Sequence, residues 1–279
     1  MARSTEPGPG RSLRLWPLGR DQLVVLACLV ALTLLAIGYL VIFAGGMKAM
    51  PAMGQMPGMP SMPGMATPTA SMASGPPYGL LALMWAVMMV GMMLPSASPM
   101  ILLYACVQRK APGSPLPRTA MFLLGYILVW IAFALLAAGL QVLLTQGALI
   151  SPDMRLTSRR IAGGVLILAG LYELTPLKHA CLRHCRGPVA FVSAHWRPGL
   201  GGALRMGALH GGYCLGCCWA LMLLLFVGGV MSFTWVFGLA ALVLIQKLLP
   251  GGRRAAAITS WAIAVLAIVA AAFAFLTPA

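Results

Sequence analysis

Seven long runs of apolar residues alternate along the chain with short polar segments. A continuous apolar run of about 20 residues has the length of a helix that crosses a membrane, and a helix satisfies its own backbone hydrogen bonds in hydrocarbon. The pattern therefore predicts an all-α fold, a polytopic membrane bundle of about seven transmembrane helices. The predicted spans cover residues 23–43, 78–106, 119–144, 161–177, 203–227, 232–249 and 255–276.

Composition supports this reading, because 61% of the 279 residues are hydrophobic and only 8% are charged. Soluble domains carry about 25% charged residues. The 19 Lys and Arg against 4 Asp and Glu give a net charge of +15, which is also typical of nucleic-acid-binding proteins. Here the basic residues occupy short loops and form no stripe interleaved with aromatics. Membrane topology therefore explains the charge, and no nucleic-acid partner is expected.

The distribution of positive charge predicts the orientation. A cytoplasmic N-terminus places most Lys and Arg on the inside, which favours an N-in, C-out topology. Arg155, Arg159 and Arg160 are exceptions that would also fit an interfacial or re-entrant segment.

In this orientation none of the seven cysteines lies in an external loop, so no external disulfide framework is expected and the thiols stay available as ligands.

Five regions follow along the chain. A basic cytoplasmic N-terminus (1–22) precedes a signal-anchor helix (23–43), an external loop (44–77), a membrane core (78–250) and a C-terminal transmembrane helix (251–279). The first apolar run is longer than the apolar region of a cleaved signal peptide, which favours a retained anchor.

The external loop is rich in Met, Pro and Gly and predicts a flexible linker without a core. Its methionines recur at every third position, a period that polyproline II would align along one side. Thioether sulfur suits Cu(I). We therefore interpret the repeat as an external copper-capture segment, with low-complexity drift as the alternative. The repeat consists of Met47, Met50, Met53, Met56, Met59, Met62 and Met65, followed by Met72.

Two methionine stripes at helical spacing run along the second predicted span. Such stripes are typical of bundle packing, because methionine adapts to irregular gaps, and a sulfur-lined ion path is the functional alternative. Pro95 and Pro99 predict a kink, and Ser96 and Ser98 can bond part of the freed backbone. The stripe interpreted as a path is Met84, Met88 and Met92, and the other is Met89, Met93 and Met100.

The densest group of ligand types lies at the head of the fifth predicted span and comprises His210, Cys214, Cys217 and Cys218. Offsets of four, seven and eight residues return to one helix face, but the first and last positions are about 12 Å apart along the axis. The three cysteines predict a compact thiol site, with His210 as an outer ligand or part of a second site. Thiolates and imidazole select Cu(I) or Zn(II). Small packing cysteines are the alternative, and glycines at 211, 212 and 216 predict close helix approach.

A second group lies between prolines 176 and 188. If this segment is helical, Cys181, His184 and Cys185 share one face. The predicted topology places them on the same side as the head of the fifth span. The two groups therefore predict a joint site or an ion hand-over between them, and nearby basic residues favour the thiolate form.

Three other polar residues near this group are predicted to have structural roles and not to bind a metal. His179 and His195 are predicted as interfacial residues rather than ligands. Glu173 is the one acid within a predicted span and is costly to bury alone. It is predicted to pair with Lys178 or with a basic residue of another helix.

Three stretches resemble a bacterial family of predicted metal-binding integral membrane proteins, catalogued as domain of unknown function 2182. They are MWAVMMVGMMLPSASPMILLYA, YELTPLKHACLRHCRGP and HGGYCLGCCWALMLLLFVGGVMSFTW, within residues 78–250. The resemblance implies a multi-pass protein of the bacterial inner membrane with a metal site, often associated with copper. The family has a Glu-Lys pair where this chain has Gln246 and Lys247, so no role for an acid is expected there.

These features predict a protein that captures Cu(I) outside and passes it toward thiols near the inner face, as a transporter or insertion factor. A copper-donor or copper-acceptor protein would be its partner, and Zn(II) is the alternative ion. No phosphorylation motif or phosphate-binding loop indicates an ATPase, and an enzymatic role is not expected. The alternatives are a membrane thiol-disulfide oxidoreductase using the Cys214 and Cys217 pair, or a structural subunit of a membrane complex.

Overall fold

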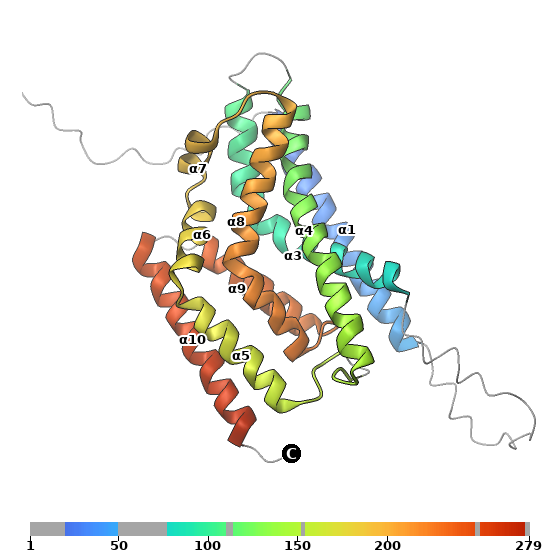
Figure 1. Ribbon diagram of the computed structural model, residues 1–279. Helices are drawn as coiled ribbons and strands as arrows, with labels where there is room; N and C mark the ends of the chain where they lie inside the picture. The colour runs from blue at the N-terminus through green and yellow to red at the C-terminus, as the bar shows by residue number, and fades with distance from the viewer. Residues whose placement is uncertain (1–19, 50–76, 110–113, 152–153, 249–251, 277–279) are drawn as a thin grey trace, which may run out of the picture.

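The computed structural model describes residues 20–49, 77–109, 114–151, 154–248 and 252–276, with side chains described for 20–42 of the first range and 257–276 of the last. Within these ranges the chain forms nine helices and no β-strand, which confirms the predicted all-α class (Figure 1). The helices are α1 (Arg20–Ala49), α3 (Tyr78–Gln108), α4 (Pro115–Gln146), α5 (Arg159–Glu173), α6 (Pro176–Arg186), α7 (Pro188–His195), α8 (Gly199–Gly228), α9 (Phe233–Leu248) and α10 (Gly252–Leu276).

Five helices in the described part of the chain are long and apolar enough to cross a membrane. These stretches are Arg20–Ile42, Tyr78–Gln108, Pro115–Gln146, Gly199–Gly228 and Ala257–Leu276. A sixth crossing results if α5 and α6 form one broken span. The predicted count was about seven, and the difference arises at residues 161–177 and 232–249.

The predicted span at 161–177 is broken in its last third. Helix α5 ends at Glu173, and α6 begins at Pro176 with a bend of 64° between the two axes. The Thr175 hydroxyl caps α6 by accepting a hydrogen bond from the Lys178 backbone N–H at 3.3 Å. Proline suits the first turn of a helix and disfavours a helical residue before it, so one apolar run becomes two helices.

The predicted span at 232–249 is a short helix. Helix α9 has 16 residues, which corresponds to about 24 Å at about 1.5 Å per residue. The hydrocarbon core is about 30 Å thick. Helix α9 alone is therefore shorter than a full crossing, although its composition is apolar.

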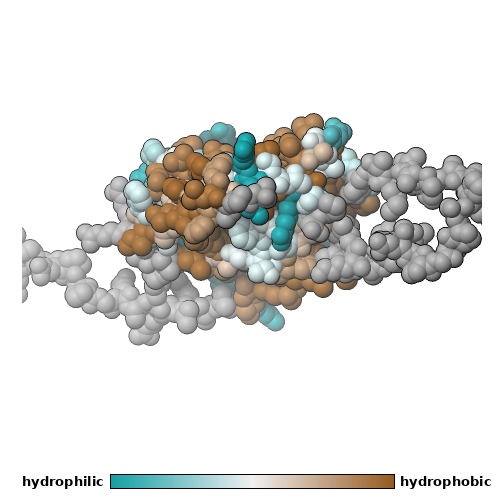
Figure 2. All heavy atoms as spheres, turned by 90° about the horizontal axis from the view of Figure 1, so that it is seen from below, coloured by the Kyte–Doolittle hydropathy of each residue, from teal (hydrophilic) through white to brown (hydrophobic). Residues whose placement is uncertain are grey.

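Large apolar side chains cover the outside of the bundle. Ile42, Leu136 and Leu266 are 77%, 73% and 70% exposed. Seen from the end where the C-terminus lies, the molecule has a mostly hydrophobic rim around a paler, more polar centre (Figure 2). Extended apolar exposure of this kind is costly in water and fits a protein whose sides contact lipid.

Helix α3 contains Pro95 and Pro99, the two prolines at which a kink was predicted, and serine hydroxyls bond backbone carbonyls near them. Pro99 has no N–H to donate to the Pro95 carbonyl, and the Ser98 hydroxyl donates to that carbonyl at 2.8 Å. The Ser96 hydroxyl donates to the Met93 carbonyl at 2.9 Å. The predicted repair is therefore confirmed for Ser98, whereas Ser96 bonds a carbonyl other than that of Gly91, which Pro95 leaves without its usual helical donor.

Helices α4 and α8 approach each other most closely through glycine. A Cβ on Gly207 would stand 1.9 Å from the Phe122 carbonyl oxygen, and a Cβ on Gly125 would stand 2.1 Å from the Leu204 carbonyl oxygen. Of the glycines predicted to permit close approach, Gly211 packs against α4 and Gly216 against α6, whereas a Cβ on Gly212 would meet no atom of another helix within 4 Å. This contact buries the face of α8 that carries the cysteines.

Substitution of Gly207 by alanine is expected to lower the free energy of unfolding by about 1–3 kcal/mol, because the added methyl group forces two backbones apart. Thermal unfolding in detergent, followed by circular dichroism, measures the change. Gly212→Ala is the matched control on the same helix, where a methyl group meets open space. Equal stability of the two variants would contradict this account of the helix contact.

Candidate metal centre

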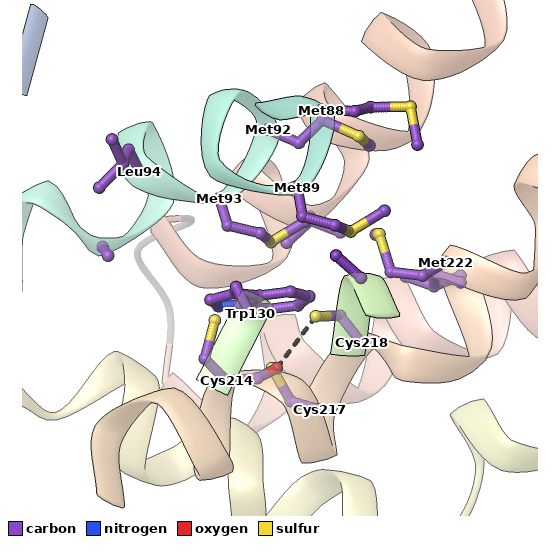
Figure 3. Packing of buried hydrophobic residues seen from close by; sticks show 14 of the residues in the cluster. Met88, Met89, Met92, Met93, Leu94, Trp130, Cys214, Cys217, Cys218 and Met222 are labelled. Atoms are coloured by element: carbon purple, nitrogen blue, oxygen red, sulfur yellow. Dashed lines mark hydrogen bonds between the residues drawn. The ribbon is translucent and has the colours of Figure 1, made fainter. Parts of the chain in front are cut away.

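The predicted ligands of α8 all lie in the interior. Their exposed fractions are 2% for His210, 0% for Cys214, 2% for Cys217 and 1% for Cys218. The thiols of Cys217 and Cys218 both donate to the Cys214 carbonyl oxygen, at 3.0 Å and 2.9 Å. Figure 3 shows the three cysteines on consecutive turns of α8. The predicted common face is thus confirmed, with two thiols turned back onto the helix.

Helix α6 brings further thiols to this face. The Cys185 thiol lies close enough to those of Cys214 and Cys217 to interact with both. The Cys181 sulfur lies 2.8 Å from the point where a Cβ on Gly216 would stand, so the glycine makes room for it. The segment between the prolines is helical, which meets the condition set for a shared face, and both of its cysteines contact α8. Two cysteine groups that are separate in sequence therefore meet in space.

His184 contacts α8 beside the thiols. Its ring stacks on Tyr213 with ring centres 4.1 Å apart and planes 2° apart. Its Nδ1 is 2.9 Å from the Ala180 carbonyl oxygen. The face that Cys181, His184 and Cys185 were predicted to share does pack on α8, and His184 lies against the residue that precedes Cys214.

His210 lies one helical turn before Cys214 among aromatic rings. Its ring centre is 5.7 Å from that of Tyr126, 5.4 Å from that of Phe191 and 6.2 Å from that of Phe122. Within the described part of the chain its Nδ1 has no hydrogen-bond partner. A buried ring nitrogen without a hydrogen-bond partner lowers the stability of the fold. Here that nitrogen belongs to His210, which was predicted as an outer ligand.

A buried lysine, Lys247 on α9, completes the polar surroundings of Cys214. Its ammonium group donates to the Cys214 sulfur and to the Ser96 hydroxyl, both at 2.9 Å, and the residue is 6% exposed. The Tyr126 hydroxyl lies 3.2 Å from the same sulfur. A cation at this distance stabilises negative charge on sulfur. No role in the site was predicted for Lys247, although an ionisable residue near the end of an apolar run was an available signal.

A second buried polar group fixes the bend between α5 and α6. The ammonium group of Lys178 forms an ion pair with Glu173 and donates to the Gln246 side-chain oxygen at 3.2 Å. The Gln246 amide in turn donates to the second Glu173 oxygen at 3.0 Å. The predicted pairing of Glu173 with Lys178 is confirmed. This ring joins α5, α6 and α9, and thereby holds α6 against the cysteines of α8.

Methionines of α3 lie opposite these cysteines. Met89 and Met93 are 0% exposed, and Figure 3 shows them on the side of α3 toward Cys218 and Met222. The predicted path residues Met84, Met88 and Met92 are buried at 1%, 2% and 5%. In Figure 3, Met88 and Met92 project from another side of α3. The second stripe is also connected to the thiols through Met93, because the Tyr126 hydroxyl donates to the Met93 carbonyl oxygen and lies 3.2 Å from the Cys214 sulfur.

The external methionine repeat falls mostly beyond the described residues. Met50, Met53, Met56, Met59, Met62, Met65 and Met72 lie in the range 50–76, which the structure does not describe. Helix α1 continues to Ala49, six residues past the predicted end of the first span. The backbone of Met47 is thus helical, where the prediction had a loop.

Across the described ranges, no three or more His, Cys, Asp or Glu side chains are already arranged to hold a metal ion. The hydrogen bonds explain this arrangement, since the sulfurs of Cys217 and Cys218 bond the Cys214 carbonyl and the Cys214 sulfur bonds Lys247. What the structure presents is a set of converging thiols beside a buried cation.

Comparison with known proteins identifies a family. A family model described as a copper chaperone, PpoB2, matches residues 82–270, which is more than half of the chain. No curated protein and no solved structure matches this chain. The matched range includes both cysteine groups and Lys247, whereas the methionine repeat lies outside it. Copper handling by the family agrees with the association that the sequence resemblance implied.

Proposed function

The chain belongs to the PpoB2 copper-chaperone family, and from this premise we propose that it binds Cu(I) through thiols of α6 and α8 and passes the ion to a partner protein. The observation that carries the proposal is the meeting of Cys185 with Cys214 and Cys217. Thiolate is the soft ligand that Cu(I) prefers. Cysteines brought together from two helices are also a means of releasing an ion, because a small movement of one helix separates them.

Ion binding would replace weak contacts. Thiol groups are weak hydrogen-bond donors, so the bonds from Cys217 and Cys218 to the Cys214 carbonyl are readily exchanged for metal–sulfur bonds. Rotation about the Cα–Cβ bond of Cys217 is the only change needed to turn its sulfur away from that carbonyl. Glycine at position 216 keeps this part of α8 uncrowded except for Cys181.

Charge balance is compatible with a Cu(I) ion held by two thiolates. One Cu(I) ion held by two thiolates carries a single negative charge, which is expensive in a buried site without a counter-charge. The Lys247 ammonium group, 2.9 Å from the Cys214 sulfur, supplies the positive charge. Zn(II) held by three thiolates would have the same net charge and is the competing ion.

Thioethers would serve as transfer ligands in this account. Met89, Met93 and Met222 are buried and lie on the side of Cys218 in the view of Figure 3, and neutral thioether sulfur binds Cu(I) without holding it by charge. We assign the external repeat from Met47 to Met65 to copper capture on the outer side of a bacterial inner membrane. The ion would then travel inward from thioether to thiol along a protein whose N-terminus is cytoplasmic.

An anaerobic transfer experiment tests the proposal. The purified protein is loaded with one equivalent of Cu(I) in detergent and mixed with a chromophoric Cu(I) chelator of comparable affinity. A chaperone should give up its copper to excess chelator within minutes and take it back from the chelator when excess copper-free protein is added. Failure to bind Cu(I) at all, or a reversible two-electron oxidation of Cys214 and Cys217 coupled to a quinone, would favour the oxidoreductase instead.

Substitution of Lys247 by methionine is expected to lower Cu(I) affinity about tenfold or more, because a unit charge at hydrogen-bonding distance contributes at least about 1.4 kcal/mol at an intermediate dielectric. Competition titration with a Cu(I) chelator measures the affinity. Lys247→Arg keeps the charge and should lose less. Equal affinities for the wild type and the methionine variant would show that the ammonium group does not compensate the site.

A further inference from the structure

Two histidines outside the thiol cluster form a pair between α6 and α7. The ring centres of His184 and His195 are 6.1 Å apart, with planes inclined by 64°. The two residues are 11 positions apart and are brought together by the turn from α6 into α7 at Gly187 and Pro188. Both side chains are partly exposed, unlike the buried thiols. The pair is thus reachable from outside the core.

Hydrogen bonding gives both rings the same protonation pattern. Nδ1 of His184 lies 2.9 Å from the Ala180 carbonyl oxygen, and Nδ1 of His195 lies 3.1 Å from the Phe191 carbonyl oxygen. A carbonyl oxygen can only accept, so each Nδ1 carries the proton. In the neutral ring Nε2 then has a free lone pair. Metal-binding histidines typically donate the other ring N–H to a carbonyl in this way.

The spacing of the rings suits one shared ion. With metal–nitrogen bonds of about 2.0 Å and about 1.1 Å from ring centre to nitrogen, two imidazoles on one ion have centres up to about 6.2 Å apart. The observed 6.1 Å falls just within this limit. Two imidazoles provide a two-coordinate nitrogen site, which suits copper among the ions that imidazole binds.

Aromatic contacts connect this pair to the thiols. The His184 ring stacks on Tyr213, the neighbour of Cys214. The Phe191 ring contacts His195 at 4.7 Å and His210 at 5.4 Å, between ring centres. His210, whose Nδ1 lacks a partner among the described residues, lies one turn from Cys214. The histidine pair therefore lies at the outer end of a line of side chains that ends at the buried sulfurs.

We propose that His184 and His195 form a second copper site, a two-imidazole station through which the ion reaches or leaves the buried thiols. The passage of copper between the histidine pair and the thiols rests on the proposed function, whereas the binding of copper by the pair does not. No electron transfer is involved, because the ion stays Cu(I) when it exchanges nitrogen for sulfur ligands. The sequence predicted that His195 is an interfacial residue rather than a ligand. Its pairing with His184 instead makes it a proposed copper ligand.

Copper stoichiometry and X-ray absorption of the purified full-length chain test the second site. The probe is Cu(I), added anaerobically to the wild type, to a His184→Phe, His195→Phe variant and to a Cys185→Ser, Cys214→Ser, Cys217→Ser variant. Phenylalanine keeps a ring to stack on Tyr213 and has no nitrogen. His179→Gln, on the same helix, is the control.

The histidine variant should bind one equivalent fewer than the wild type and lack the imidazole scattering signal. The cysteine variant should keep one nitrogen-bound equivalent. Unchanged stoichiometry in the histidine variant, with no imidazole signal in the wild type, would overturn the inference while leaving the thiol site standing. A wild type that binds no copper through sulfur would instead refute the proposed function. Thermal unfolding within a few degrees of wild type confirms that each variant is folded.

Discussion

The double substitution Cys214→Ser, Cys217→Ser is expected to weaken Cu(I) binding by about 100-fold or more, since even supporting residues of metal sites contribute about 10–100-fold. Serine has nearly the size of cysteine, but its oxygen is a hard, neutral ligand that Cu(I) does not favour. Both positions are buried, at 0% and 2% exposure, so the substitution removes sulfur without opening the surface. Anaerobic competition titration measures the loss.

Cys28→Ser and Cys106→Ser provide the control for this prediction. Both cysteines are free, Cys28 is exposed and Cys106 is half-buried, and neither belongs to the cysteine groups of α6 and α8. Removing them leaves the proposed ligands intact and should leave affinity unchanged. If this control weakened binding as strongly as the double substitution did, the assignment of the thiol site would be wrong.

Substitution of Lys178 by methionine is expected to lower the free energy of unfolding by about 3–5 kcal/mol, because it leaves the Glu173 carboxylate buried without its partner. Both residues are 0% exposed, and the Gln246 side chain forms a further hydrogen bond with each of their charged groups. The same variant should weaken Cu(I) binding, because the ion pair holds α6 and hence Cys185 in place. Thermal unfolding and Cu(I) titration of one preparation measure both effects.

The double variant Glu173→Gln, Lys178→Met separates charge from packing. It removes both charges together and should recover most of the lost stability, since replacing a buried ion pair by neutral groups is often close to neutral. A single variant as stable as the wild type would show that the ion pair does not hold the bend. A double variant as unstable as the single one would assign the loss to packing.

Local hydrophobicity was sufficient to predict the long helices. The predicted spans 78–106, 119–144 and 203–227 correspond to α3, α4 and α8 within a few residues at each end. Apolar length is a property of each stretch by itself, so it can be read without knowing the neighbours. The same reasoning missed the bend after Glu173, because hydropathy continues across it and the turn depends on Thr175 and Pro176.

The candidate site was predictable in its ligand types and less so in its surroundings. The spacing of Cys214, Cys217 and Cys218 identifies a helix face, and helical spacing likewise joins Cys181 to Cys185. The position of Lys247 beside Cys214 could not be derived, because it depends on how α9 packs against α3 and α8. The same holds for the pairing of His184 with His195, which the turn between α6 and α7 creates.

The metal content of the purified protein tests the central claim most directly. The wild type and the Cys185→Ser, Cys214→Ser, Cys217→Ser variant would be loaded with Cu(I) anaerobically in detergent, and bound Cu and Zn would be measured by elemental analysis. X-ray absorption of the same samples identifies the ligand atoms. We expect about one or more sulfur-bound copper ions per wild-type chain and no sulfur-bound copper in the variant. Equal copper in both proteins, or sulfur-bound zinc in place of copper in the wild type, would contradict a Cu(I) site built from the thiols of α6 and α8.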